Sequence, residues 1–552
     1  MLCGLLCGLL CGLVPLVAEG WAQERCDVLV YGSTPAGIMA AIQAAEMGKR
    51  TILISPQRHV GGTMTSGLGA TDMNAYRLIG GQARKFFQRV YQHYLDPRAW
   101  PAETREEYFQ RSKHRIYTGK ADDALMQWAF EPHVALKVFN DMLRDVGVTV
   151  IAGQRLNLAD GGVEKEQHHI RLVRMESGES YAAKVFVDAT YEGDLMAGAG
   201  VSYIVGRESN ATYGERFNGV RPQELGSLFA ATGQAISIDP FVVPGDRASG
   251  LLPFIHPQPP GAAGEGDRGV QAYCYRFTLT SDPANRRAIE KPANYDPLWF
   301  EMYGRICAAS PELELPKLFG IAPLPNKKTD INACNIPGAN YDWANGDYAL
   351  RERLAQMHKD FALGKYWFLT TDPRVPESFK AELKQYGLPK DEFQDNDNFP
   401  YQVYVREARR MISDYVMTEE NELKRGTRTA EDGIAIGSYA VDSHQVGYYV
   451  DERDKLWLDG ALWESARRYP ISYRSIVPKQ AECGNLIVPV CVSSSHTAYG
   501  SIRMEPVYMV MGHSAGTAAA LAIDAHCDVQ QVPYATLRRQ LAAQGQIFLD
   551  AL

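Results

Sequence analysis

The order of apolar and polar positions near the start of the chain predicts a strand, a helix and a second strand. Residues 27–31 (DVLVY) form a short β-rich run with apolar character, typical of a strand covered on both faces. In residues 37–47, Ile38, Ala41, Ile42 and Ala45 recur at helical spacing. The run TILIS (51–55) follows as a second buried strand. Together these segments predict one βαβ unit.

The rest of the chain alternates regular and irregular segments. Residues 131–151 predict a helix that ends at Gly147 and leads into a strand, and residues 170–190 predict a hairpin with its turn at Ser177-Gly178. Residues 205–480 are rich in proline and glycine loops. Within them, residues 405–417 (VREARRMISDYVM) predict a helix on which Arg406 and Arg410 share a face. Pairing with Glu407 or Asp414 is the favoured interpretation, and binding of an anionic group is the alternative. Residues 485–524 predict a strand, a polar loop and an apolar helix.

Composition narrows the class of protein. The 552 residues exceed one compact core, so two or three packed units are expected. The net charge is −8 and no basic run occurs, which argues against nucleic acid as a partner. A small-molecule substrate is the expected partner, and the sequence does not indicate an oligomeric state.

The first 23 residues differ from the rest. Their apolar run extends from Leu2 to Ala18, and Gly20 and Ala22 form a cleavage pattern just before Gln23. We therefore expect export, periplasmic or secreted. A retained membrane anchor is the alternative, because no Lys or Arg precedes the apolar run.

No metal site is expected. The cysteines beyond this segment are scattered and lack a C-x-x-C pair, which favours neither zinc nor a disulfide scaffold. His168 and His169 lie on a predicted hairpin arm, where alternation would point their rings to opposite faces. A metal shared by these two residues is therefore not expected.

The turn after the first strand carries the first functional signal. The sequence GSTPAG supplies Gly32 for a tight turn and Gly37 for close helix packing, with Pro35 at the helix start. This arrangement predicts a dinucleotide site. The second strand ends in Ser55 where an acid usually holds the ribose, and Ser55 with Arg58 favours NADP instead.

Two later segments favour a longer ligand. Gly61, Gly62 and Thr63, in HVGGTMTSGLGATD, let main chain lie against a ligand beyond the pyrophosphate. The return strand ends in Asp188-Ala189-Thr190 and is followed by Gly193-Asp194, as a second crossing of a cofactor requires.

These stretches carry a family resemblance. YGSTPAGIMAAIQAAEMGK, RHVGGTMTSGLG, VDATYEGDLMAGAGV and NLIVPVCVSSSHTAYGSIRMEPVYMVMGHSAGTAAALA resemble FAD-dependent oxidoreductases with a glutathione-reductase-type FAD domain, in an exported branch with an ATYEGD motif. The resemblance implies an α/β fold, a Rossmann-like FAD-binding domain with an inserted mixed α+β substrate domain. The implied boundaries are 1–23 for the leader, 24–205 and 481–552 for the FAD-binding parts, and 206–480 for the substrate region.

The resemblance also implies roles for single residues, with FAD as cofactor. Arg503 and a helix start near Gly512 to Ala515 would lie at the isoalloxazine. The expected cofactor residues are Gly32, Ser33, Pro35, Ala36, Gly37, Ser55, Arg58, Gly61, Gly62, Thr63, Asp188, Ala189, Thr190, Gly193, Asp194, Gly512 and Ala515. The family commonly has an acid at the position of Ser55, so this chain departs from the pattern there.

The catalytic candidates lie in two polar loops. SSSHTAYGSIRMEP offers His496 and Tyr499 as candidate proton acceptors, with Arg503 as a flavin or substrate contact. His444 is another candidate base. The expected activity is hydride transfer to flavin from a CH–OH or CH–CH group of a small polar or carbohydrate-like substrate. An NADP-linked reductase and a non-redox flavin-fold protein are the alternatives.

Overall fold

The fold is organised by one mixed sheet in the order β3-β2-β1-β6-β5-β4, with β21 also paired to β6. The computed structural model describes residues 23–72, 75–112, 125–228 and 236–551, so the predicted leader lies outside the described residues. The strands are β1 (Gln23–Tyr31), β2 (Thr51–Ser55), β3 (Thr149–Ala152), β4 (Val163–Glu166), β5 (His169–Arg174), β6 (Ser180–Asp188) and β21 (Leu486–Ile487). An α/β fold is thereby confirmed.

The predicted βαβ unit is present with shifted bounds. β2 has the predicted ends, and α1 (Pro35–Glu46) begins at the proline of the turn. β1 starts four residues before the predicted strand because Gln23 to Cys26 pair with Ser180 to Ala183 of β6. The start of β1 is therefore set by its pairing with β6 and not by the hydrophobicity of its own residues.

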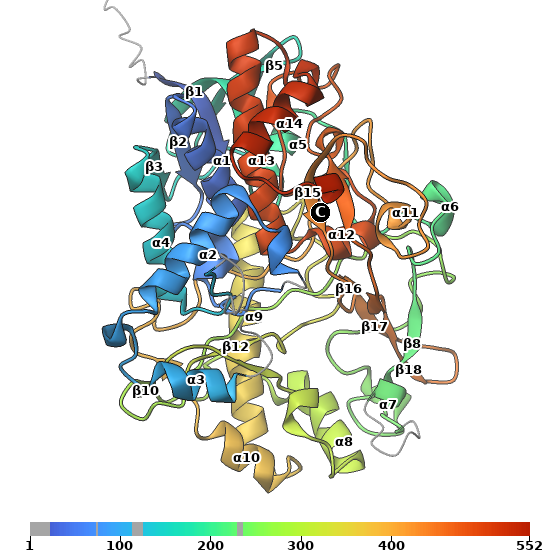
Figure 1. Cartoon of the computed structure of the whole chain (residues 1–552). Coiled ribbons are helices and arrows are strands. Elements are labelled where there is room, and N and C mark those ends of the chain that lie inside the picture. Colours follow the sequence, from blue (N-terminus) through green and yellow to red (C-terminus); the bar gives the residue numbers. More distant parts are fainter. Residues whose placement is uncertain (1–22, 73–74, 113–124, 229–235, 552) are drawn as a thin grey trace, which may run out of the picture.

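The C-terminal segment returns to this sheet. Leu486 of β21 pairs in parallel with Phe186 of β6, and α13 (Glu505–Ala525) then packs along α1 (Figure 1). Small residues allow this approach: a Cβ at Gly512 would lie 2.1 Å from the carbonyl oxygen of Ala36, and one at Gly516 would lie 2.3 Å from that of Ala40. Helices α2 (Gly81–His93), α4 (Pro132–Asp145) and α14 (Tyr534–Ala543) lie nearby (Figure 1).

The middle of the chain forms an irregular mixed region. Its long helix α9 (Tyr348–Thr371) runs from the sheet toward α8 (Glu301–Ala309) and α10 (Glu377–Leu383) (Figure 1). Its one four-stranded sheet has the order β8-β18-β17-β9, formed by Pro222–Glu224, Leu456–Asp459, Gly447–Val450 and Ile255–His256.

Short elements make up the rest of the described residues. The other strands are β7 (Tyr203–Ile204), β10 (Arg286–Arg287), β11 (Ile321–Pro323), β12 (Thr329–Ile331), β13 (Leu388–Pro389), β14 (Arg410–Met411), β15 (Gly433–Gly437), β16 (Val441–Ser443), β19 (Leu462–Glu464) and β20 (Tyr469–Ser472). The other α-helices are α3 (Arg105–Arg111), α5 (Asp194–Gly198), α6 (Asn210–Tyr213), α7 (Leu225–Leu228), α11 (Glu419–Glu422) and α12 (His496–Ile502).

The helix predicted for residues 405–417 is wrong. The segment is extended and contains β14, which pairs with β7. Its arginines separate: Arg406 donates to Asn332, whereas Arg410 pairs with Glu208 and also with Glu407 at 2.8 Å, so the predicted pairing with a nearby acid holds for Arg410 alone. Buried partners on distant segments stabilise the extended backbone and override the local helical pattern.

The predicted placement of the adjacent histidines is also wrong. β5 begins at His169, and His168 belongs to the preceding turn, where Gln167 has φ 54°. Strand alternation therefore does not apply, and both imidazoles face Asp528. The seven cysteines of the described residues are all free thiols. No helix in the described ranges is long and apolar enough to cross a membrane.

Candidate active site

The first cavity lies at the carboxyl ends of β1, β2 and β6 and has a volume of about 290 Å³. β1 connects to β2 on one side and has β6 on its other side, so the cavity is at the point where the strand order reverses. Ligands of open α/β sheets bind at such points. The lining residues include Gly32, Ser33, Thr34, Gly62, Thr190, Tyr191, Asp194, Arg351 and Glu352.

The turn after β1 is built as the dinucleotide hypothesis requires. Gly32 has φ +102°, and a Cβ there would lie 2.5 Å from the backbone nitrogen of Thr190. The Thr34 side chain caps α1 by accepting from the Gly37 N–H, and it donates to the carbonyl of Ala189. Thr34, the residue before α1, lines the cavity, so the helix begins beside it, and a helix N-terminus suits a phosphate.

At the carboxyl end of β2, the side chain of Ser55 is hydrogen-bonded to residues of the neighbouring turns. Ser33 Oγ donates a 2.7 Å hydrogen bond to Ser55 Oγ, which also accepts from the Gln57 N–H. Ser55 is buried and does not line the cavity. Arg58 is exposed and lines an adjoining cleft of about 520 Å³, together with Gln57.

Two carboxylates after β6 have different surroundings. Asp188 accepts from the N–H groups of Thr190 and Met196, which fixes the turn below the cavity. Burial raises its pKa to about 6, although these hydrogen bonds favour the ionised form. Asp194 lines the cavity and is paired with Arg351 at 2.6 Å and Arg409 at 2.8 Å. Asp188 thus supports the turn and Asp194 anchors α9 over the site.

The glycine-rich segment meets the start of α13 through a buried triad. Glu505 Oε1 accepts from Thr63 Oγ1 at 2.6 Å and from the Tyr191 hydroxyl at 2.5 Å. Burial raises the pKa of Glu505 to about 7, while the two hydrogen bonds oppose this shift. Its other oxygen, Oε2, is buried without a partner among the described residues. The triad therefore presents a polar atom where the sequence places the cofactor.

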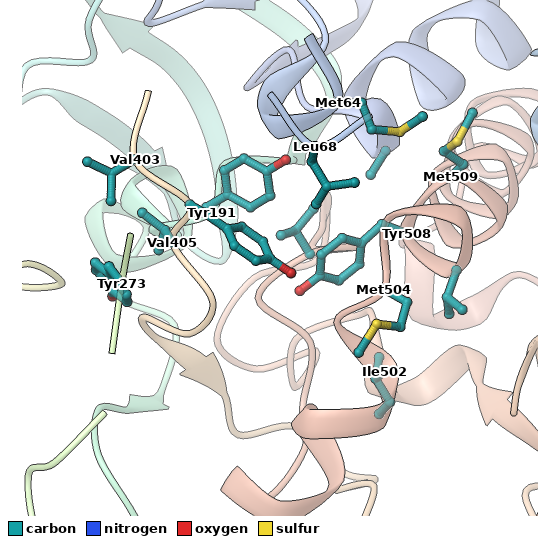
Figure 2. Close-up of a cluster of buried hydrophobic side chains, with 14 of the residues drawn as sticks. Met64, Leu68, Tyr191, Tyr273, Val403, Val405, Ile502, Met504, Tyr508 and Met509 are labelled. Carbon is teal, nitrogen blue, oxygen red and sulfur yellow. The ribbon is translucent and has the colours of Figure 1, made fainter. Parts of the chain in front are cut away.

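An apolar cluster surrounds this triad. Figure 2 shows Met64 and Leu68 from the glycine-rich segment beside Tyr191 and Tyr508. All four side chains are buried. The remaining labelled members are Tyr273, Val403, Val405, Ile502, Met504 and Met509. The segments that the resemblance assigns to the cofactor thus meet in a buried, largely apolar environment.

The predicted helix start near Gly512 is wrong. α13 begins at Glu505, with Pro506 in its first turn, so Gly512 and Ala515 lie in its middle. Gly512 packs against Ala36 of α1 and is a helix-packing residue. The small residues lie within the helix and allow its close contact with α1.

Two of the four catalytic candidates are enclosed by protein. His496 Nδ1 lies 2.9 Å from both oxygens of Glu407, and its Nε2 lies 3.1 Å from Ser443 Oγ. Tyr499 donates to the carbonyl of Val490 and accepts from Tyr508. Neither residue lines a described cavity of the site. Buried partners occupy the polar atoms of both side chains.

Of the other two candidates, His444 lines a second cavity of about 680 Å³, whereas Arg503 is buried and does not line it. His444 Nε2 lies 3.4 Å from Asp442 Oδ2, and its Nδ1 lies 3.2 Å from Asn335 Nδ2. Arg503 donates to the carbonyl of Asp442 and to the Tyr404 hydroxyl. Burial, reinforced by Arg406, lowers the pKa of His444 to about 4, so its imidazole is neutral near pH 7.

Sequence reasoning missed the cationic wall of this cavity. Arg276 is buried and paired with Asp330 at 2.6 Å, and its Nη1 has no partner among the described residues. Lys365 lies on α9, and its Nζ donates to the carbonyl of Ala333. Burial lowers the pKa of Lys365 to about 8. No local motif marks these residues, because the fold brings them together from separate segments.

Comparison with known protein families identifies one matching family. The sequence model described as FAD dependent oxidoreductase matches residues 27–541. None of the curated proteins compared with the chain matches it.

The solved structures that match the chain share little sequence with it. A geranylgeranyl bacteriochlorophyll reductase-like protein from Thermoplasma acidophilum is 12% identical, with 95% of this chain and 85% of that chain covered and a TM-score of 0.35. Thioredoxin reductase from T. acidophilum is 14% identical over 30% of this chain and 36% of that chain, with a TM-score of 0.18. L-amino acid deaminase from Proteus vulgaris is 18% identical over 35% and 54%, with a TM-score of 0.22. The chain thus spans about a third to a half of these last two structures.

Proposed function

Because the chain belongs to the FAD dependent oxidoreductase family, we propose that it oxidises a CH–OH or CH–CH group of a small polar or carbohydrate-like substrate. Membership makes it an FAD-dependent enzyme. The substrate is held in the 680 Å³ cavity, and His444 is the proton acceptor on its wall. The apolar leader supports an exported setting for this reaction.

The residues at the first cavity suit FAD. The turn at Gly32 and the first turn of α1 would hold the pyrophosphate, and Gly62 and Thr63 would lie beside the chain that follows it. Glu505 Oε2, buried and unpartnered among the described residues, is a polar atom available to the cofactor. Bound FAD supplies the hydride acceptor, so the protein must orient the donor carbon and move one proton.

Glu352 can take the ribose-binding role of the acid that is replaced by Ser55 in this chain. Glu352 of α9 lines the first cavity and pairs with Arg155 at 2.7 Å. Arg155 follows β3, the neighbour of β2 in the sheet. Glu352 thus places a carboxylate near the end of β2, where it would accept hydrogen bonds from ribose hydroxyls.

The single observation that carries the proposal is the position of His444. Of the two candidate histidines, it alone lines a described cavity of the site. Asp442 accepts from Nε2–H and fixes the tautomer, which leaves Nδ1 as the basic atom. The Asn335 amide donates a hydrogen bond to Nδ1, and a substrate hydroxyl replaces this donor when it binds. Proton transfer of this kind contributes typically 10²–10⁴-fold to a rate.

The cationic wall favours substrates with several oxygen atoms. Arg276 Nη1 and Lys365 Nζ are donors at the cavity, and Asn332 and Asn335 add amide groups. Hydroxyl and carboxylate groups are the natural acceptors for such donors. Sugars, polyols and hydroxy acids are therefore the classes to screen.

The experiment starts from the absorption spectrum of the purified chain. Flavin bands released by acid precipitation would show non-covalent FAD. Anaerobic bleaching is then measured with a panel of sugars, polyols and 2-hydroxy acids. His444→Asn should slow bleaching by the active compound about 10²–10⁴-fold. A colourless chain that FAD cannot reconstitute, or equal bleaching by His444→Asn, would refute the proposal.

A further inference from the structure

A cluster outside the flavin site brings two imidazoles and a carboxylate together. His169 Nε2 lies 2.7 Å from Asp528 Oδ1, and His168 Nε2 lies 3.5 Å from Asp528 Oδ2. One ligand atom from each residue falls within 4.8 Å of the others. The two rings lie side by side, with centroids 4.2 Å apart. Each oxygen of one carboxylate thus faces a different imidazole.

Three distant segments hold this arrangement in place. The left-handed turn at Gln167 puts both rings on one side of the hairpin. The Gly484 N–H donates to the carbonyl of His168 and fixes the hairpin tip. Gln480 Nε2 donates to Asp528 Oδ2 at 2.7 Å. The carboxylate is therefore oriented by a supporting partner, as metal ligands usually are.

A glycine leaves room beside the ligand atoms. A Cβ at Gly484 would lie 2.8 Å from Asp528 Oδ2 and 2.8 Å from His169 Nε2. Within the described part of the chain, no Lys or Arg forms an ion pair with Asp528. The side chains remain partly open to solvent, at 36% for each histidine and 15% for the aspartate. An ion can thus reach the cluster.

A second cluster in the same protein shows the contrasting case. Glu131, His133 and Glu392 also place ligand atoms within 4.8 Å of one another. There the buried Lys328 Nζ lies 2.8 Å from Glu131 and 2.7 Å from Glu392, so a cation is already present. Among the described residues, no lysine or arginine pairs with the cluster at Asp528 in this way.

We propose that His168, His169 and Asp528 form a binding site for a divalent metal ion, with zinc as the preferred occupant. Two neutral imidazoles and one carboxylate are a common zinc donor set, and water completes the tetrahedron. The ion joins the β4–β5 hairpin to the segment after α13. It is remote from the oxidation chemistry and acts as a structural clamp.

Zinc binding to the full, tag-free chain tests the site by titration calorimetry and metal analysis after dialysis. One equivalent is expected, and zinc should raise the melting temperature. His168→Ala, His169→Ala and Asp528→Asn should each remove stoichiometric binding. Gln480→Ala should weaken it about 10–100-fold, as loss of a supporting partner does.

Two further variants separate ligation from folding. Gly484→Ala keeps every ligand but places a Cβ within 2.8 Å of Asp528 Oδ2 and His169 Nε2, so it should also lose zinc. His133→Ala removes a histidine from the cluster that already holds Lys328, and it should bind zinc like the unaltered chain. Cobalt should give the intense visible bands of a tetrahedral site. No stoichiometric binding, or binding retained in His169→Ala, would overturn the proposal.

Discussion

Thr63 Oγ1 donates a 2.6 Å hydrogen bond to Oε1 of Glu505, although 442 positions separate the two residues. This contact joins the glycine-rich segment to the first turn of α13. Tyr191, from the segment after β6, donates to the same oxygen. The cofactor-binding parts of the chain are therefore linked through one buried carboxyl group.

Glu505→Gln should flatten the pH dependence of stability. The pKa of Glu505 is raised to about 7 from an ordinary 4.5, so between these values the folded chain holds a proton that the unfolded chain releases. Stability from this group is full below pH 4.5 and falls as pH rises toward 7, by at most about 1.4 kcal/mol per pH unit. Denaturant unfolding from pH 5 to 8 measures the slope. Parallel curves for the two proteins would contradict the assignment.

Gly62→Ala should weaken FAD binding by more than about tenfold, since a Cβ at this position would lie 2.5 Å from the Tyr191 hydroxyl. Gly62 has φ +56°, so backbone strain also contributes. Gly48→Ala is the matched control, because Gly48 has φ +76° but open space around it. The control should lose about 1–2 kcal/mol of stability and keep its flavin affinity. Fluorescence titration of the flavin-free proteins measures both affinities, and equal affinities would contradict the close-packing argument.

His496→Ala and His444→Ala should differ in their effect on the stability of the fold. His496→Ala removes a buried imidazole that contacts Glu407 and Ser443, while Arg410 still pairs with Glu407 at 2.8 Å, so it should destabilise the fold by about 1–3 kcal/mol through unsatisfied buried groups. His444→Ala should change stability little, because Arg503 still pairs with Asp442. Thermal melts compare the two variants. A larger loss in His444→Ala would show that the roles are reversed.

Flavin bleaching by the active substrate should fall at low pH. The pKa of His444 is lowered to about 4, so the imidazole is neutral above that value and can accept a proton. The rate should stay level from pH 8 to 5 and decline as pH drops through 4. Stopped-flow measurements give this profile. His444→Asn should lack the decline, and a decline centred near pH 6.5 would point to a different base.

The sequence by itself determined the βαβ unit, its turn and the family. The apolar runs of β1 and β2, the spacing in α1 and the glycines of GSTPAG act over a few residues, so their consequences can be read locally. The same holds for the strand that leads into Asp188 and for the helix over residues 132–145.

The tertiary structure decided which polar residues meet and which are enclosed. The sequence offers both His496 and His444 as candidate bases. In the structure, Glu407 and Ser443 enclose His496, whereas His444 lines a cavity. The extended backbone at Arg410 and the paired faces of His168 and His169 also depend on distant partners. Burial and charge pairing are long-range effects. Their outcome is set by neighbours in space, which a local pattern does not contain.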